Sequence, residues 1–173
     1  ESGMVVDPIT MHPNDTLADA IALKQHHGIS GFPVTEKDGT LVGIITNRDI
    51  RFAKDTSQPV SSFMTHENLV TVEKNISQTD AEKLLHQHRI EKLLVTDASK
   101  QLLGMITVKD MERAKTFPYA AKDSRGRLRV AAATGVGKAG LERAEALIAA
   151  ELDAIVVDTA HGHSQSVLDT VKE

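Results

Sequence analysis

The sequence predicts an α/β fold in which one mixed unit of strands and helices is used twice and is followed by a shorter β-α-β segment. Three observations lead to this prediction: a gapless internal repeat, strand and helix periodicities that recur within each copy, and a glycine-rich turn late in the chain. The chain has 173 residues, of which 40% are hydrophobic and only 3% aromatic. We therefore expect a core built mainly from aliphatic side chains.

The repeat has an offset of 61 residues, which places Thr10 on Thr71 and needs no gap. Fixed-period self-similarity of this kind indicates one structural unit used more than once. Several identities carry the alignment: Asn14 with Asn75, Asp19-Ala20 with Asp80-Ala81, Val34-Thr35 with Val95-Thr96, Gly43 with Gly104, Ile45-Thr46 with Ile106-Thr107, and Asp49 with Asp110.

Each copy is predicted to run strand, helix, strand, strand, helix. The first helix is announced by Thr16-x-x-Asp19 in one copy and Ser77-x-x-Asp80 in the other, both capping boxes in outline. A hairpin should follow, formed by residues 32–35 and 41–45 in the first copy and by 93–96 and 102–106 in the second. Its turns lie at Lys37-Asp38-Gly39 and Ala98-Ser99-Lys100.

A single copy is too small to cover its own sheet, so two copies predict packing about a pseudo-twofold axis. The Pro- and Ser-containing stretch 55–67 is interpreted as the linker between them. A second change of composition, near Phe117-Pro118, marks the end of the repeat.

The strongest candidate binding residues are Thr46-Asn47-Arg48-Asp49 and Thr107-Val108-Lys109-Asp110, each directly after a strand and at a predicted helix start. Free N–H groups at a helix start favour phosphate, Arg or Lys adds charge, and Asp can accept from a ribose diol. The same Thr-x-x-Asp pattern is also a plain capping box that needs no ligand. Because the pattern recurs in both copies, each time with a basic residue at the matching position, nucleotide binding is favoured.

These segments resemble CBS motifs, whose tandem pair is called a Bateman module. The resemblance rests on Gly31-Phe32-Pro33-Val34 and on Leu41 to Asp49, with Ile90 to Val95 and Leu103 to Asp110 in the second copy. It implies purine nucleotides as ligands, ATP or GTP with Mg²⁺. The implied contacts are Ser30, Gly31, Phe32, Pro33, Thr46, Arg48, Asp49, Lys92, Thr107, Lys109 and Asp110.

The last third reads as a strand, the loop Gly135-Val136-Gly137-Lys138-Ala139-Gly140, a helix through Leu152, and a strand from Ala154 to Val157 that ends on Asp158. This G-x-G-x-x-G pattern fits a Rossmann NAD-dependent dehydrogenase. A β-α-β unit of a TIM barrel fits it as well.

Val157-Asp158-Thr159-Ala160-His161-Gly162-His163-Ser164 resembles a strand and loop of the bacterial inosine monophosphate (IMP) dehydrogenases. That resemblance covers essentially the whole chain and favours the barrel. It implies an oxidoreductase that oxidises IMP to XMP with NAD in guanine nucleotide synthesis, with Asp158, Thr159 and His161 as cofactor contacts. It also implies a monovalent cation such as K⁺, bound outside this chain, and a homotetramer, or an octamer formed through the CBS pairs.

The resulting fold class is a tandem CBS pair followed by an incomplete β-α-β segment of a TIM barrel. The predicted divisions are a barrel entry segment (1–4), CBS motif 1 (5–54), the linker (55–67), CBS motif 2 (68–116) and a partial catalytic barrel (117–173). The resemblance implies a covalent intermediate on cysteine, and the chain has none. We therefore predict a catalytically inactive piece whose role is regulatory. A free-standing CBS-pair sensor of adenine nucleotides is the alternative.

Composition excludes several other classes. The net charge of −4 and the absence of a basic stripe do not predict a nucleic-acid partner. No apolar run is long enough to span a membrane, and the opening residues do not look like a signal peptide, so we expect a cytoplasmic protein. His161-x-His163 lacks a third ligand nearby, and no metal site is predicted there.

Overall fold

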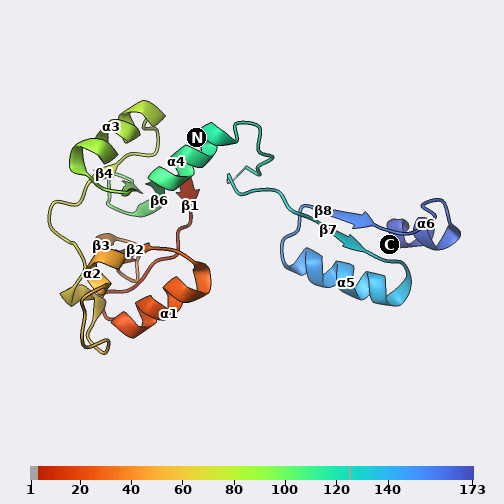
Figure 1. The fold of residues 1–173 in the computed structure, drawn as a ribbon, viewed down its shortest axis with the longest axis horizontal. Helices are drawn as coiled ribbons and strands as arrows, with labels where there is room; N and C mark the ends of the chain where they lie inside the picture. Colours follow the sequence, from red (N-terminus) through yellow and green to blue (C-terminus); the bar gives the residue numbers. More distant parts are fainter. Residues whose placement is uncertain (1–3, 125) are drawn as a thin grey trace. The chain divides into compact units, whose positions relative to one another are not determined.

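The computed structural model describes residues 4–124 and 126–173, which divide into two compact units, one within Glu1–Tyr119 and one within Ala120–Glu173 (Figure 1). The two units are described separately below. Residues 1–3, most of the predicted barrel entry segment, lie outside the described residues.

The first unit contains both copies of the repeat, and each copy is a helix, a hairpin and a second helix. The first copy comprises α1 (Leu17–His27), β2 (Gly31–Thr35), β3 (Leu41–Thr46) and α2 (Asn47–Ile50), followed by a 3-10 turn at Val60–Ser62. The second comprises β4 (Thr71–Val72), α3 (Gln78–His88), β5 (Lys92–Thr96), β6 (Leu102–Thr107) and α4 (Val108–Thr116). The predicted hairpins are confirmed, and both are antiparallel with a register irregularity at the same repeat position.

The segment before each copy pairs with the hairpin of the other copy. Strand β1 (Met4–Val6) runs antiparallel to β6, with Met4 opposite Ile106, in a sheet of order β1-β6-β5-β4. Correspondingly, Thr65 at the end of the linker forms an antiparallel bridge with Ile44 of β3. The two copies are therefore joined by exchanged edge segments as well as by packing.

A pair of reciprocal backbone hydrogen bonds marks the pseudo-twofold axis. The Leu41 N–H donates to the Lys100 carbonyl at 2.9 Å, and the Leu102 N–H donates to the Gly39 carbonyl at 3.2 Å. These two bonds are related by the repeat offset. Gly39 and Lys100 both have positive φ, of 87° and 61°, so the less obvious second turn has the backbone of the first.

Helix starts and cores follow the sequence pattern. Thr16 and Asp19 form the full capping box, whereas Ser77 and Asp80 form only the half in which the Ser77 hydroxyl accepts from the Asp80 N–H. One core gathers around α1, β2 and β3, and a second around α3, β5 and β6. A third small cluster of Leu41, Leu94 and Met105 draws on both copies.

The second unit is a β-α-β segment followed by a helix. Strands β7 (Ala131–Thr134) and β8 (Ala154–Val157) are parallel and are connected through α5 (Gly137–Ala149); α6 (Gln165–Lys172) comes last. The prediction that the first of these helices runs through Leu152 was wrong. The helix ends at Ala149, and Glu151 then takes a left-handed conformation, φ 60°, which breaks the helical path.

The glycine loop is a tight backbone contact. A Cβ on Gly140 would lie 2.2 Å from the carbonyl oxygen of Gly135, and Gly137 has φ 73°. The Thr134 hydroxyl donates to the Gly140 carbonyl at 2.7 Å in a buried position. Close packing thus accounts for Gly140, and the left-handed backbone accounts for Gly137, without a ligand.

No helix in the described ranges 4–124 and 126–173 is long and apolar enough to cross a membrane.

Candidate functional site

A cleft of about 560 Å³ opens in the first unit, between residues of the two copies. The first copy contributes the end of β3 and the start of α2, and the second contributes the stretch around the start of β5. The residues that line it are Ser30, Ile44, Thr46, Asn47, Arg48, Asp49, Arg51, Thr65, Asn68, Leu69, Val70, Arg89, Ile90, Glu91, Lys92 and Leu94.

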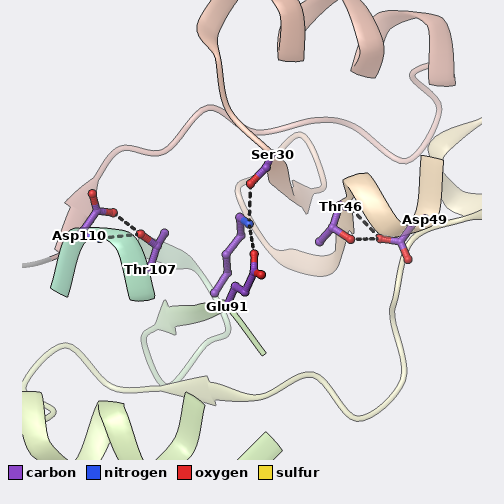
Figure 2. A network of polar contacts seen from close by, with 7 residues as sticks. Ser30, Thr46, Asp49, Glu91, Thr107 and Asp110 are labelled. Atoms are coloured by element: carbon purple, nitrogen blue, oxygen red, sulfur yellow. Dashed lines mark hydrogen bonds and ion pairs between the residues drawn. The ribbon is translucent and has the colours of Figure 1, made fainter. Parts of the chain in front are cut away.

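Thr46 and Asp49 both line this cleft and are hydrogen-bonded to each other (Figure 2). The Thr46 N–H and hydroxyl both donate to Asp49 Oδ2, at 2.6 and 2.7 Å. The helix that they start, α2, has only four residues. Its partial charge is therefore small, and the predicted helix-start argument for phosphate is weak in this copy. The other oxygen, Asp49 Oδ1, accepts no hydrogen bond within the described part of the chain.

Lys92 reaches across from β5 to the first copy. Its Nζ donates to Ser30 Oγ at 3.0 Å and lies 4.0 Å from Glu91 Oε2 (Figure 2). The side chain is only 11% exposed, and this burial lowers the pKa of Lys92, against the opposing effect of Glu91. A Cβ on Gly31 would lie 3.1 Å from Lys92 Cε, so the glycine lets the lysine stem pass close to β2.

Three guanidinium groups, those of Arg48, Arg51 and Arg89, also line the cleft. Across residues 4–124 and 126–173 they form no ion pair and no side-chain hydrogen bond. Sequence reasoning identified Arg48 but missed Arg51 and Arg89. Two signals could have found them: Arg51 is three residues after Arg48, one helical turn on, and Arg89 replaces the helix-ending glycine of the first copy, Gly28.

Arg89 has the left-handed backbone conformation with which the first helix of each copy ends. It ends α3 with φ 53°, just as Gly28 ends α1 with φ 65°. Left-handed backbone costs free energy for a residue that carries a Cβ. A costly conformation at the edge of a cleft is typical of a functional position.

The eleven predicted nucleotide residues separate into groups. Five of them line the cleft: Ser30, Thr46, Arg48, Asp49 and Lys92. Gly31, Phe32 and Pro33 are buried in β2, and Phe32 is part of the first core. The remaining three, Thr107, Lys109 and Asp110, belong to the second copy and are not among the residues that line this cleft.

The second-copy residues form a well-made helix cap. The Thr107 hydroxyl accepts from the Asp110 N–H at 3.1 Å and donates to Asp110 Oδ2 at 2.5 Å (Figure 2). The helix that follows, α4, has nine residues, and Lys109 is exposed in its first turn. Capping thus explains Thr107 and Asp110, whereas Lys109 has no capping role.

In the second unit, Asp158 follows β8 and is exposed, and its N–H donates to the Thr134 carbonyl at 2.9 Å. Beside it, Thr159 Oγ1 is buried and has no hydrogen-bond partner in the part of the chain that the structure describes. His161 is exposed. The Thr159 hydroxyl and the Asp158 carboxylate can therefore both still form hydrogen bonds with a bound molecule.

Comparison with known proteins identifies the family. A profile described as "IMP dehydrogenase / GMP reductase domain" matches residues 57–173, and one described as "CBS domain" matches residues 4–55. The chain belongs to the IMP dehydrogenase / GMP reductase family. Because the glycine loop lies inside the first match, the Rossmann alternative is no longer needed.

Individual relatives support the same family. The chain is 56% identical over 174 residues to an inosine-5'-monophosphate dehydrogenase of Rhizobium tropici and 47% identical over 175 residues to that of Aquifex aeolicus. These matches cover 99% and 100% of the chain but 34% and 36% of the relatives. The chain therefore spans about a third of the length of these curated members of the family.

Solved structures of a related enzyme of the same family resemble the chain. Trypanosoma brucei GMP reductase in complex with guanosine 5'-triphosphate has a TM-score of 0.81 and 33% identity, covering 99% of this chain and 42% of that one. The C318A form in complex with guanosine 5'-monophosphate has a TM-score of 0.81, 32% identity and coverage of 99% and 37%. The fold is thus a CBS domain followed by part of the family's catalytic domain.

Proposed function

We propose that the first unit is the regulatory purine-nucleotide-binding module of an IMP dehydrogenase, the enzyme that oxidises IMP to XMP with NAD in guanine nucleotide synthesis. The observation that carries the proposal is the cleft in which Arg48, Arg51, Arg89 and Lys92 meet. Such a concentration of cationic side chains suits a phosphate chain. The similarity to a GMP reductase solved with guanosine 5'-triphosphate supports the same ligand class.

The rest of the cleft suits the other parts of a nucleotide. Its volume of about 560 Å³ is in the range of small-molecule sites, roughly 300–1,000 Å³. Asp49 Oδ1 is free to accept from ribose hydroxyls, and Ser30 can bond to sugar or phosphate. Apolar side chains that can cover a base are Ile44, Leu69, Val70, Ile90 and Leu94. A triphosphate, ATP or GTP, would bring Mg²⁺ with it.

Thr107, Lys109 and Asp110 of the second copy are proposed as a further contact set, for a nucleotide without a triphosphate chain. In the intact enzyme, a bound nucleotide regulates by its differential affinity for alternative states of the protein. We propose that the enzyme is cytoplasmic and forms a homotetramer, or an octamer through the CBS pairs. Its monovalent cation site, for K⁺, is assigned to parts of the enzyme outside this chain.

NAD is assigned to the second unit through Asp158, Thr159 and His161. The buried Thr159 hydroxyl, which has no hydrogen-bond partner among the described residues, and the exposed Asp158 carboxylate fit a group that both donates and accepts hydrogen bonds, as a ribose does. When bound, NAD supplies the hydride acceptor. Asp158 would hold the sugar, and its backbone bond to Thr134 fixes it at the end of β8.

Calorimetric titration of the 173-residue chain with ATP, GTP and AMP tests the regulatory function. We expect saturable binding by the wild type and at least tenfold weaker binding by Arg48→Ala and Asp49→Ala, since both residues line the cleft. Asp19→Ala is the matched control because Asp19 makes the same Thr-x-x-Asp cap away from the cleft. Binding that is unchanged in both cleft variants would contradict the assignment.

A further inference from the structure

The repeat relates the cationic residues of the cleft to a much less cationic set. Applying the 61-residue offset to Arg48, Arg51, Arg89 and Lys92 gives Lys109, Glu112, Gly28 and Gly31. Applied to the acidic residues of the cleft, it gives Asp110 for Asp49 and Ser30 for Glu91. The six charged residues that line the cleft at Thr46 therefore sum to two net positive charges, and the six residues related to them by the offset sum to one net negative charge.

The cations of the cleft are available to a ligand. Within the described residues, the guanidinium groups of Arg48, Arg51 and Arg89 have no ionic partner. In the same part of the chain, the polar contacts of Lys92 Nζ are the hydroxyl of Ser30 at 3.0 Å and a carboxylate oxygen of Glu91 at the outer limit of an ion pair, 4.0 Å. A phosphate chain would therefore not have to displace strong internal pairs.

The difference between the two copies lies at positions that otherwise match. Gly28 and Arg89 end their helices with the same left-handed backbone, φ 65° and 53°. Glycine adopts this conformation freely, whereas arginine adopts it at a cost. The second copy thus has an arginine at a position where the backbone conformation favours glycine. The guanidinium group of this arginine lines the cleft.

Charge decides which ligand each set can hold. Each phosphate of a triphosphate chain brings negative charge, which cationic side chains offset and carboxylates repel. Among the residues that the offset relates to the charged residues of the cleft, Lys109 is the one cation, and it is outnumbered by Asp110 and by Glu112, which is exposed and has no ion pair among the described residues.

Resting on the proposed function, we infer that the two repeat-related sites are not equivalent: a nucleotide triphosphate binds once per chain, in the cleft at Thr46, and not in the related position at Thr107. The stoichiometry of polyphosphate binding is then one, although the fold is a repeat of two.

Two reciprocal substitutions test this inference by titration with MgATP and with inorganic tripolyphosphate. Arg51→Glu gives the cleft the residue found in the second copy, and we expect at least tenfold weaker binding. Glu112→Arg makes the opposite exchange, and we expect a second binding event. Lys54→Glu is the matched control, because it makes the same change of charge three residues along the chain at an exposed position outside the cleft.

Arg89→Gly is a second variant that should keep its fold, because glycine suits the left-handed backbone at this position. We expect it to weaken MgATP binding more than AMP binding. Two wild-type sites of equal affinity for MgATP would overturn the inference and leave the proposed function intact. Equal weakening by Lys54→Glu and Arg51→Glu would also overturn it. Absence of binding by ATP, GTP and AMP alike would overturn both proposals.

Discussion

Lys92 is a charged residue in a position with little access to water. Its ammonium group bonds to Ser30 Oγ, and its stem passes against the backbone at Gly31. Burial disfavours the charged form, which is why the pKa of Lys92 is lowered from the usual 10.5. A residue that costs stability in the absence of ligand and lines a cleft is well suited to binding an anion.

We expect Lys92→Met to raise the free energy of unfolding at neutral pH by about 1 kcal/mol, because it replaces a desolvated charge with an apolar chain of similar length. Ser30 is exposed, so its hydroxyl can return to water. The same substitution should weaken ATP binding. Chemical denaturation and calorimetry measure the two effects, with exposed Lys54→Met as the control.

The stabilisation by Lys92→Met should depend on pH. Between the lowered pKa of Lys92 and 10.5, the unfolded chain binds more protons than the folded chain, so this lysine makes stability rise with pH across that window. The Lys92→Met variant lacks this rise in the free energy of unfolding. The gap in unfolding free energy between variant and wild type should therefore narrow as the pH approaches 10.5, and a gap independent of pH would contradict the burial argument.

At the scale of elements, the exchange of edge segments joins the two copies. Strand β1 lies on β6, and Thr65 lies on β3. Both contacts need a glycine on the hairpin strand: a Cβ on Gly104 would lie 2.8 Å from the Val5 carbonyl oxygen, and one on Gly43 would lie 2.6 Å from Met64 Sδ. The repeated glycines therefore reflect close backbone approach between copies.

Gly104→Ala should displace β1 and lower the free energy of unfolding by about 1–3 kcal/mol, the usual range for overpacking. Its added methyl group meets backbone, which cannot give way locally. Deuterium uptake by a peptide containing Met4–Val6 should rise.

Gly43→Ala is the informative comparison. Its nearest neighbour is the end of the flexible Met64 side chain, with the Thr65 carbonyl oxygen next at 3.0 Å. A smaller loss of stability is expected. Uptake at Met4–Val6 that stays at the wild-type level in Gly104→Ala would show that this contact does not hold β1 in place.

For the whole molecule, the sequence holds a CBS domain and part of the family's catalytic domain but no cysteine. A thiolate nucleophile cannot form in such a chain. The nucleotide binding proposed for the first unit and dehydrogenase activity can therefore be tested separately.

The purified 173-residue chain, mixed with IMP and NAD, should produce no NADH above the rate without protein. It should still bind purine nucleotide under the same conditions, which serves as the control for folding. NADH production that persists after repeated purification would contradict this prediction.

Local and repetitive features could be read from the sequence alone. The 61-residue offset, the hairpins, the Thr16–Asp19 cap and the β-α-β order of the second unit all depend on residues near in sequence or on a self-match. The motif around Asp158 indicated the family that the comparisons then identified. Turn chemistry, capping and periodicity are properties of short segments, so one sequence is enough to recognise them.

Only the tertiary structure decided which of these residues share a site. It brought Arg51 and Arg89 to the cleft, separated Thr107, Lys109 and Asp110 from it, and placed β1 in the sheet of the other copy. Such contacts join segments tens of residues apart, and the packing of one copy on the other, which no local pattern encodes, determines them.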